Sequence, residues 1–299
     1  MTDQQRTGRT TRRGRPAAGA ALLAAVLAGG AALTGCSPDA TVEASADQRA
    51  GSTPDQLSAD ALTAVRSAAD ITGRAGSARA GTELVTESAE KKAVFTGTGG
   101  YDYVKRIGRL EVQVPPGAAT TGKLVEVLLP GTVYLQNSGA KVPEGKWVKL
   151  DVRQLPDGNL VSGGATDPAA AAGALRGAQK AETVGTETVD GVVLKHFRGT
   201  LDLAKAADAT GGRGGDSLRM GAQTFTVKEV PYDAWLDEQG RLRKVVEVFT
   251  FAGVAGSKEA KDQVRVVSTT ALTDFGKPVE AAEPPAADIY AMKPTESPK

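Results

Sequence analysis

Apolar and polar residues alternate in many short stretches of this chain. Leu110, Val112 and Val114, for example, are separated by Glu111 and Gln113. Successive side chains of a β-strand point to opposite faces, so this pattern predicts strands that are buried on one face and wet on the other. Such strands form antiparallel sheets. Further strands are predicted over residues 123–129, 133–135, 147–152, 192–203, 224–230, 232–236, 242–251 and 264–273.

Two segments carry helix signals instead. Ser58 is a candidate N-cap, and apolar residues follow it at helical spacing as far as Gly73. Asp167 and Pro168 open an alanine-rich segment that we expect to be helical towards Ala181. Strands before and after a central helical segment, without a regular strand–helix alternation, predict an α+β fold.

Two turn-forming segments divide the second half of the chain. Asp190 and Gly191 lie between two strand patterns, and an Asp-Gly pair at such a place predicts a tight hairpin. The segment Gly211–Gly215 contains four glycines around one arginine. Because glycine opposes regular structure, we expect a mobile loop there, either a lid over a site or an inert insertion.

The first 36 residues have the organisation of an export signal. Five arginines precede a stretch, residues 17–34, that contains no charged side chain. This stretch ends in Leu33-Thr34-Gly35-Cys36, which resembles the bacterial lipobox. In a lipobox the cysteine sulfur is acylated and becomes the new N-terminus, so Cys36 is the predicted lipidation site.

These signals divide the chain into four predicted parts. Residues 1–35 form a lipoprotein signal peptide, and residues 36–57 form a flexible tether rich in small and polar residues. Residues 58–290 form the folded domain, and residues 291–299 form a disordered tail. We therefore expect a protein anchored by its lipid to the extracytoplasmic face of the cell membrane.

The composition excludes several functions. The chain has 36 basic and 35 acidic side chains, a net charge of +1, which gives no basis for binding nucleic acid. One Cys and one His cannot form a structural zinc site, and His196 alone could serve as a histidine base. We therefore expect no enzyme activity, no catalytic residue, no metal and no cofactor. Lys91-Lys92 and Lys105-Arg106 are interpreted as solvated charge pairs.

Four segments in this order resemble a known family. They are Trp147–Asp151, His196–Lys205, Val230–Leu242 and Asp274–Val279. Together with the lipobox, they are similar to the LppX/LprG-type lipoproteins of actinobacteria, which have a LolA-like fold. The resemblance extends over roughly residues 58–290.

The resemblance implies a curved antiparallel sheet, a half-barrel, with helices covering its concave face. It also implies an apolar cavity between sheet and helices that takes the acyl chains of a lipid or glycolipid. The chain would then be a monomeric carrier or chaperone in the cell envelope, bound to the membrane through Cys36 and perhaps loaded by an envelope transporter.

Eight apolar residues at alternate strand positions are the candidates for lining that cavity. Alternatively, the same residues pack a filled core, and the protein is then a non-catalytic interaction or regulatory module of the envelope. The candidates are Leu110, Val112, Val114, Val133, Leu135, Val245, Phe249 and Phe251.

Overall fold

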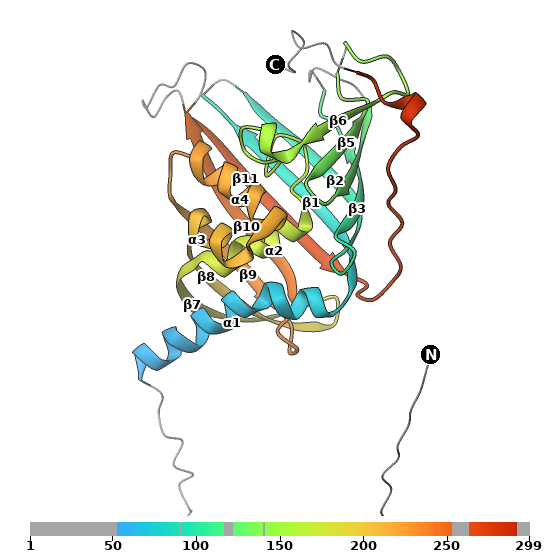
Figure 1. The fold of residues 1–299 in the computed structure, drawn as a ribbon. Coiled ribbons are helices and arrows are strands. Elements are labelled where there is room, and N and C mark those ends of the chain that lie inside the picture. Colours follow the sequence, from blue (N-terminus) through green and yellow to red (C-terminus); the bar gives the residue numbers. More distant parts are fainter. Residues whose placement is uncertain (1–52, 90, 117–121, 140, 253–262, 292–299) are drawn as a thin grey trace, which may run out of the picture. The chain divides into compact units, whose positions relative to one another are not determined.

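A single eleven-stranded sheet dominates the fold (Figure 1). The structure, a computed structural model, describes residues 53–89, 91–116, 122–139, 141–252 and 263–291. The strands are β1 (Ser77–Glu87), β2 (Lys92–Asp102), β3 (Ile107–Gln113), β4 (Lys123–Leu129), β5 (Thr132–Gln136), β6 (Trp147–Asp151), β7 (Ala178–Val189), β8 (Val192–Asp202), β9 (Glu229–Leu236), β10 (Leu242–Ala252) and β11 (Gln263–Thr273).

The strand order shows how the sheet is assembled. It runs β6-β5-β4-β3-β2-β1-β11-β10-β9-β8-β7, and every neighbouring pair is antiparallel. Two meanders, β1–β6 and β7–β11, therefore meet at one pairing, between β1 and β11, in which Arg79 faces Thr273. The first and the last strands of the chain thus lie side by side in the middle of the sheet.

Four α-helices accompany the sheet in the described part of the chain. They are α1 (Pro54–Arg74), α2 (Pro168–Ala174), α3 (Leu203–Thr210) and α4 (Gly212–Thr224). Figure 1 shows α2, α3 and α4 against one face of the sheet and α1 crossing its end. Their buried side chains form one cluster with those of the strands, including Val65, Leu84, Leu110, Leu218 and Val245. The predicted α+β half-barrel, with helices on its inner face, is confirmed.

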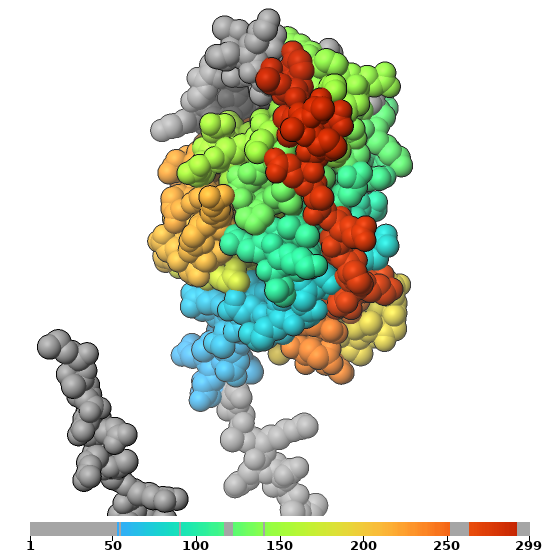
Figure 2. All heavy atoms as spheres, turned by 45° about the vertical axis from the view of Figure 1, so that its right-hand side comes forward, coloured from blue at the N-terminus to red at the C-terminus, as the bar shows by residue number. Residues whose placement is uncertain are grey.

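The outer face of β4–β6 has a smaller apolar cluster of its own. Val127, Tyr134 and Trp147 are buried there against Ala281 and Ile289 of the C-terminal segment. Figure 2 shows this segment, in red, running along the surface of the molecule. The last described residues therefore belong to the folded domain.

Several predicted boundaries differ from the structure. The first helix begins after Thr53, not Ser58, because Thr53 and Gln56 cap it reciprocally. Residues 54–57, assigned to the tether, are therefore helical. The central helix ends at Ala174, and a 3-10 turn, Leu175–Gly177, leads into β7. Here the pairing of β7 with β8 overrides the helix propensity of alanine.

Two predictions concern the connections of the second half. The Asp190-Gly191 hairpin is confirmed, since both residues have positive φ, 49° and 76°, as a type I′ turn requires. The mobile loop at Gly211–Gly215 is wrong, because α4 begins at Gly212. A Cβ on Gly215 would lie 2.5 Å from the Ala207 oxygen, so glycine lets α3 and α4 pack closely. The strand expected over 224–230 starts only at Glu229, because α4 extends to Thr224.

Candidate functional site

Two hollows lie between the helices and the inner face of the sheet. One, the polar cavity, has a volume of about 270 Å³, and the other, the apolar groove, is more open and has a volume of about 940 Å³. Gly158 and Asn159 line the polar cavity, whereas Asp157 and Val161 line the apolar groove. The loop 157–162, here called the partition loop, therefore separates the two.

Asp157 fixes the partition loop. Its carboxylate accepts hydrogen bonds from the backbone N–H groups of Asn159, Val161 and Ser162, at 3.2, 2.7 and 2.8 Å. The Ser162 hydroxyl donates a fourth, at 2.6 Å. Asp157 is 4% exposed, so these bonds also satisfy a buried charge. The aspartate thus determines the shape of the wall that both hollows share.

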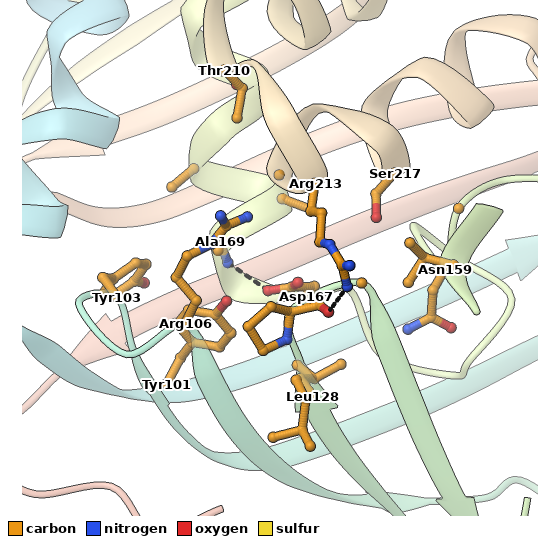
Figure 3. A pocket seen from close by; sticks show the side chains of 18 of the residues that line it. Tyr101, Tyr103, Arg106, Leu128, Asn159, Asp167, Ala169, Thr210, Arg213 and Ser217 are labelled. Carbon is orange, nitrogen blue, oxygen red and sulfur yellow. Dashed lines mark hydrogen bonds between the residues drawn. The ribbon is translucent and has the colours of Figure 1, made fainter. Parts of the chain in front are cut away.

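The polar cavity is lined mainly by turns and helix ends. Its walls come from the β2–β3 and β4–β5 hairpins, from α1 and α2, and from the α3–α4 junction (Figure 3). Asp102 accepts hydrogen bonds from the N–H groups of Val104 and Lys105 and so fixes the hairpin turn that carries Arg106. Figure 3 shows Arg106, Asp167 and Arg213 around the same space.

The charged groups of the cavity have different partners. Arg176 forms a salt bridge with Asp70 at 2.6 Å, and Arg213 donates to the Pro130 carbonyl at 3.2 Å. Asp167 caps α2 by accepting from the Ala169 N–H at 2.8 Å. Within the described residues, the Arg106 guanidinium forms no hydrogen bond or salt bridge. Its field acts on Asp167 and lowers the pKa of that carboxyl, whereas burial has the larger, opposite effect and raises it to about 6.

A second buried carboxyl lies behind the cavity wall. Glu126, on β4, is inaccessible to solvent and accepts a hydrogen bond from the Asn159 side chain at 2.5 Å. Burial raises the pKa of the Glu126 carboxyl to about 8, so it is mostly protonated at pH 7. The Asn159 Oδ1 atom and the Tyr103 hydroxyl are both buried and have no hydrogen-bond partner among the described residues. Both residues line the cavity.

The apolar groove has the opposite chemistry. Its walls come from the ends of β1, β2, β10 and β11, from the partition loop and from the end of α4. Three phenylalanines form much of its surface, and Phe225 stacks on the buried Phe249 with ring centroids 4.7 Å apart. The apolar lining residues are Ala93, Phe95, Pro115, Pro116, Pro156, Val161, Phe225, Phe251 and Val266.

The structure disperses the eight predicted cavity residues. Six of them belong to the buried core cluster: Leu110, Val112, Val133, Leu135, Val245 and Phe249. Val114 and Phe251 are partly buried against that cluster. Val133 also lines the polar cavity, and Phe251 lines the apolar groove. Contact of these residues with a lipid stays a prediction, and Cys36 lies outside the described residues.

The remaining polar residues show no catalytic arrangement in the described part of the chain. His196 stacks on Trp235, with ring centroids 4.3 Å apart, and contacts Asp233 at 2.6 Å, as expected of a packed histidine. Across the described ranges, no group of three or more His, Cys, Asp or Glu could bind a metal ion. None of the helices described is long and apolar enough to cross a membrane.

Sequence reasoning missed the residues that define both hollows. Arg106, interpreted as a solvated charge, lines the polar cavity, and Lys91 and Lys92 line the apolar groove. Arg213 lies in the segment expected to be a loop. A single arginine among four glycines was the available signal, because small residues often mark a close approach of backbone and side chain.

Comparisons with known proteins give similarity of structure only. No protein-family model and no curated protein matches the sequence. LprF from Mycobacterium bovis is 14% identical, with a TM-score of 0.42, over 76% of this chain and 98% of its own. The lipoprotein LppX from Mycobacterium tuberculosis is 11% identical, with a TM-score of 0.46, over 75% and 99%.

A LolA superfamily protein from Nitrosomonas europaea is also similar. It is 11% identical, with a TM-score of 0.30, over 72% of this chain and 94% of its own. The structural neighbours of this chain therefore include the lipoproteins LprF and LppX, as the sequence resemblance predicted.

Proposed function

We propose that the chain is a membrane-anchored lipoprotein that binds an acyl chain of a lipid or glycolipid in the apolar groove. The observation that carries this proposal is the groove itself, with a volume of about 940 Å³ and walls of phenylalanine, valine and proline. Its volume falls in the range of about 300–1,000 Å³ that is typical of ligand sites. An exposed apolar surface of this kind commonly marks a binding site.

The energetics favour an acyl chain as the ligand. Each CH₂ group transferred from water to an apolar surface contributes about 0.8 kcal/mol, so a long chain gains several kcal/mol without any specific polar contact. Lys91 and Lys92 lie among the lining residues, and Lys92 forms a salt bridge with Glu87 at 3.0 Å. The groove therefore combines an apolar surface with ammonium groups that suit a polar headgroup.

The proposed location follows from the leader. Acylation of Cys36 would anchor the protein at the extracytoplasmic face of the membrane, where residues 37–53 would tether the domain. An anchored protein cannot travel far, so it would act as a carrier or chaperone that passes its lipid to a nearby partner. An envelope transporter is the partner that this role calls for.

The packed interior supports a second candidate function. Six of the eight predicted cavity residues are buried in one core cluster, as in a filled scaffold. Such a scaffold would bind a protein partner in the envelope instead of a lipid. The two functions differ in whether the groove takes up acyl chains.

Native mass spectrometry of residues 37–299 distinguishes them. We expect adducts of lipid mass that disappear after organic extraction and return when phospholipid is added. Phe251→Ser, which makes the groove wall polar, should reduce these adducts. Val189→Ser changes an exposed valine at the β7–β8 hairpin and should not. Protein that takes up no phospholipid or glycolipid would refute lipid binding and favour the scaffold.

A further inference from the structure

We infer that the polar cavity is a second binding site, which takes the phosphate monoester of a small polyol. The polar cavity and the apolar groove share no lining residue. This inference is therefore independent of the proposed function, and either one can fail while the other stands.

Two guanidinium groups give the cavity its preference for an anion. Arg106 comes from the β2–β3 turn and Arg213 from the first turn of α4. Neither forms a salt bridge with any residue that the structure describes, whereas the third arginine of the lining, Arg176, is paired with Asp70. A phosphate monoester carries a charge of about −1.5 to −2 at pH 7, which two guanidinium groups match. Arginine also binds phosphate with two parallel hydrogen bonds.

Glycines make room for both arginines. A Cβ on Gly214 would lie 2.8 Å from the Arg106 Nη2 atom, and a Cβ on Gly131 would lie 3.3 Å from Arg213. Gly211 and Gly212 have positive φ, 65° and 50°, and form the tight junction that starts α4 beside the cavity. The glycine-rich segment thus shapes the cavity wall around the guanidinium groups.

Hydrogen-bonding groups inside the cavity suit hydroxyls on the ligand. The Asn159 Oδ1 atom is buried, lacks a partner in the described part of the chain and can only accept, so it requires a donor such as a hydroxyl. The Tyr103 hydroxyl is likewise buried and unpartnered. Thr210 and Ser217 also line the cavity. A polyol attached to the phosphate would satisfy these groups, whereas inorganic phosphate would leave them unpaired.

The size of the cavity limits the polyol. Its volume of about 270 Å³ is just below the range of about 300–1,000 Å³ found for ligand sites. Glycerol 3-phosphate, or the same group as the headgroup of phosphatidic acid, has the required chemistry. The ligand can thus be either a free phosphate ester or a lipid headgroup.

Calorimetry of the full-length protein, reconstituted in phosphatidylcholine nanodiscs, tests the inference. We expect glycerol 3-phosphate to bind, with weaker binding of inorganic phosphate and none of glycerol. Arg106→Gln and Arg213→Gln should each weaken binding about tenfold or more, because each removes charge-assisted hydrogen bonds. Arg219→Gln removes one charge from the same helix but from outside the cavity, and should have no effect.

One variant should act in the opposite direction. Asp167→Asn removes the carboxylate that repels an anion, while asparagine can still cap α2. It should therefore bind glycerol 3-phosphate more tightly than the wild type.

The source of the ligand is tested with nanodiscs that contain phosphatidic acid. If they displace glycerol 3-phosphate from the wild type, the site takes the lipid headgroup; if they do not, it takes the free ester. Absence of binding in both settings overturns the inference. An equal loss in Arg219→Gln also overturns it, and inorganic phosphate that binds as tightly as the ester refutes the polyol.

Discussion

The polar cavity and the apolar groove share a sheet, a set of helices and the partition loop, yet their chemistry is opposite. Turns and helix ends supply the charged and amide groups of the cavity, such as Arg106, Asn159 and Arg213. Strands supply apolar walls of the groove, such as Phe95, Phe251 and Val266. The difference teaches that one scaffold can present two kinds of surface, according to which elements face each hollow.

Removal of the partition should abolish this difference and have the largest effect. Asp157→Ala deletes the acceptor of three backbone N–H groups and one hydroxyl, which are then left without partners. We expect the free energy of unfolding to fall by roughly 3–5 kcal/mol, because each unsatisfied buried donor costs about 1–3 kcal/mol. Urea unfolding measures the loss. Asp157→Asn keeps one acceptor oxygen and should lose less, and equal losses would contradict this account.

The buried carboxyls beside the two hollows should make stability depend on pH. Burial raises the pKa values of Glu126 and Glu247 from 4.5 to about 8. In the unfolded chain these groups ionise near pH 4.5, so stability is greatest below that pH and is lost as the pH rises towards 8. Each group should contribute a slope of about 1 kcal/mol per pH unit within this window.

Denaturant titrations between pH 5 and pH 8 measure that slope. Glu126→Gln should remove the share of the carboxyl next to the polar cavity, and Glu247→Gln the share of the carboxyl on β10. An exposed control, Glu111→Gln, should leave the slope unchanged. If both buried variants retain the wild-type slope, neither carboxyl is neutral in the folded protein.

The two hollows should also be separable by function. Ala93→Trp places a large ring in the apolar groove at the end of β2 and should weaken acyl-chain binding about tenfold, the effect of roughly 1.4 kcal/mol of lost apolar contact. Glycerol 3-phosphate binding should not change. Arg106→Gln should produce the reverse pattern. Fluorescent fatty-acid titration and calorimetry measure the two affinities, and a variant that lowers both would show that the hollows are coupled.

Neighbouring glycines of α4 should respond differently to the same substitution. Gly215→Ala puts a methyl group 2.5 Å from the backbone oxygen of Ala207 and should destabilise the protein by about 1–3 kcal/mol. Gly214→Ala meets only the movable end of Arg106 and a methyl group of Thr210, so stability should change by less than about 1 kcal/mol. It should nevertheless weaken binding in the polar cavity. Thermal unfolding and calorimetry together measure this contrast, and equal destabilisation would contradict it.

Local patterns predicted the sheet because its strands are determined by local patterns. The alternation around Leu110 and Val112 reflects burial on one face, and Asp190-Gly191 provides the φ angles that its hairpin requires. The central helix was predicted too long because its end depends on strand pairing far away in sequence. The start of α1 was misplaced because Thr53, with a complete capping box, was overlooked in favour of Ser58.

The candidate site was less accessible to sequence reasoning. Tyr103, Arg106, Asn159, Asp167 and Arg213 come from separate turns and helix ends, and no spacing along the chain relates them. The glycines around Arg213 were interpreted through their freedom of conformation, whereas the structure uses their lack of a side chain. Only tertiary packing reveals which of these two properties matters at a given position.

The central position of β1 and β11 has a consequence for how the protein is made. Almost two hundred residues separate Arg79 from Thr273, whereas most other strand pairs are joined by short hairpins. Local hairpins form early, but the seam between the two meanders must wait for the last strand to leave the ribosome. During that interval β1 has an unpaired edge, which is a template for association with other chains. A protein released before Thr273 would consist of two unjoined half-sheets, so synthesis must be complete before the fold can close.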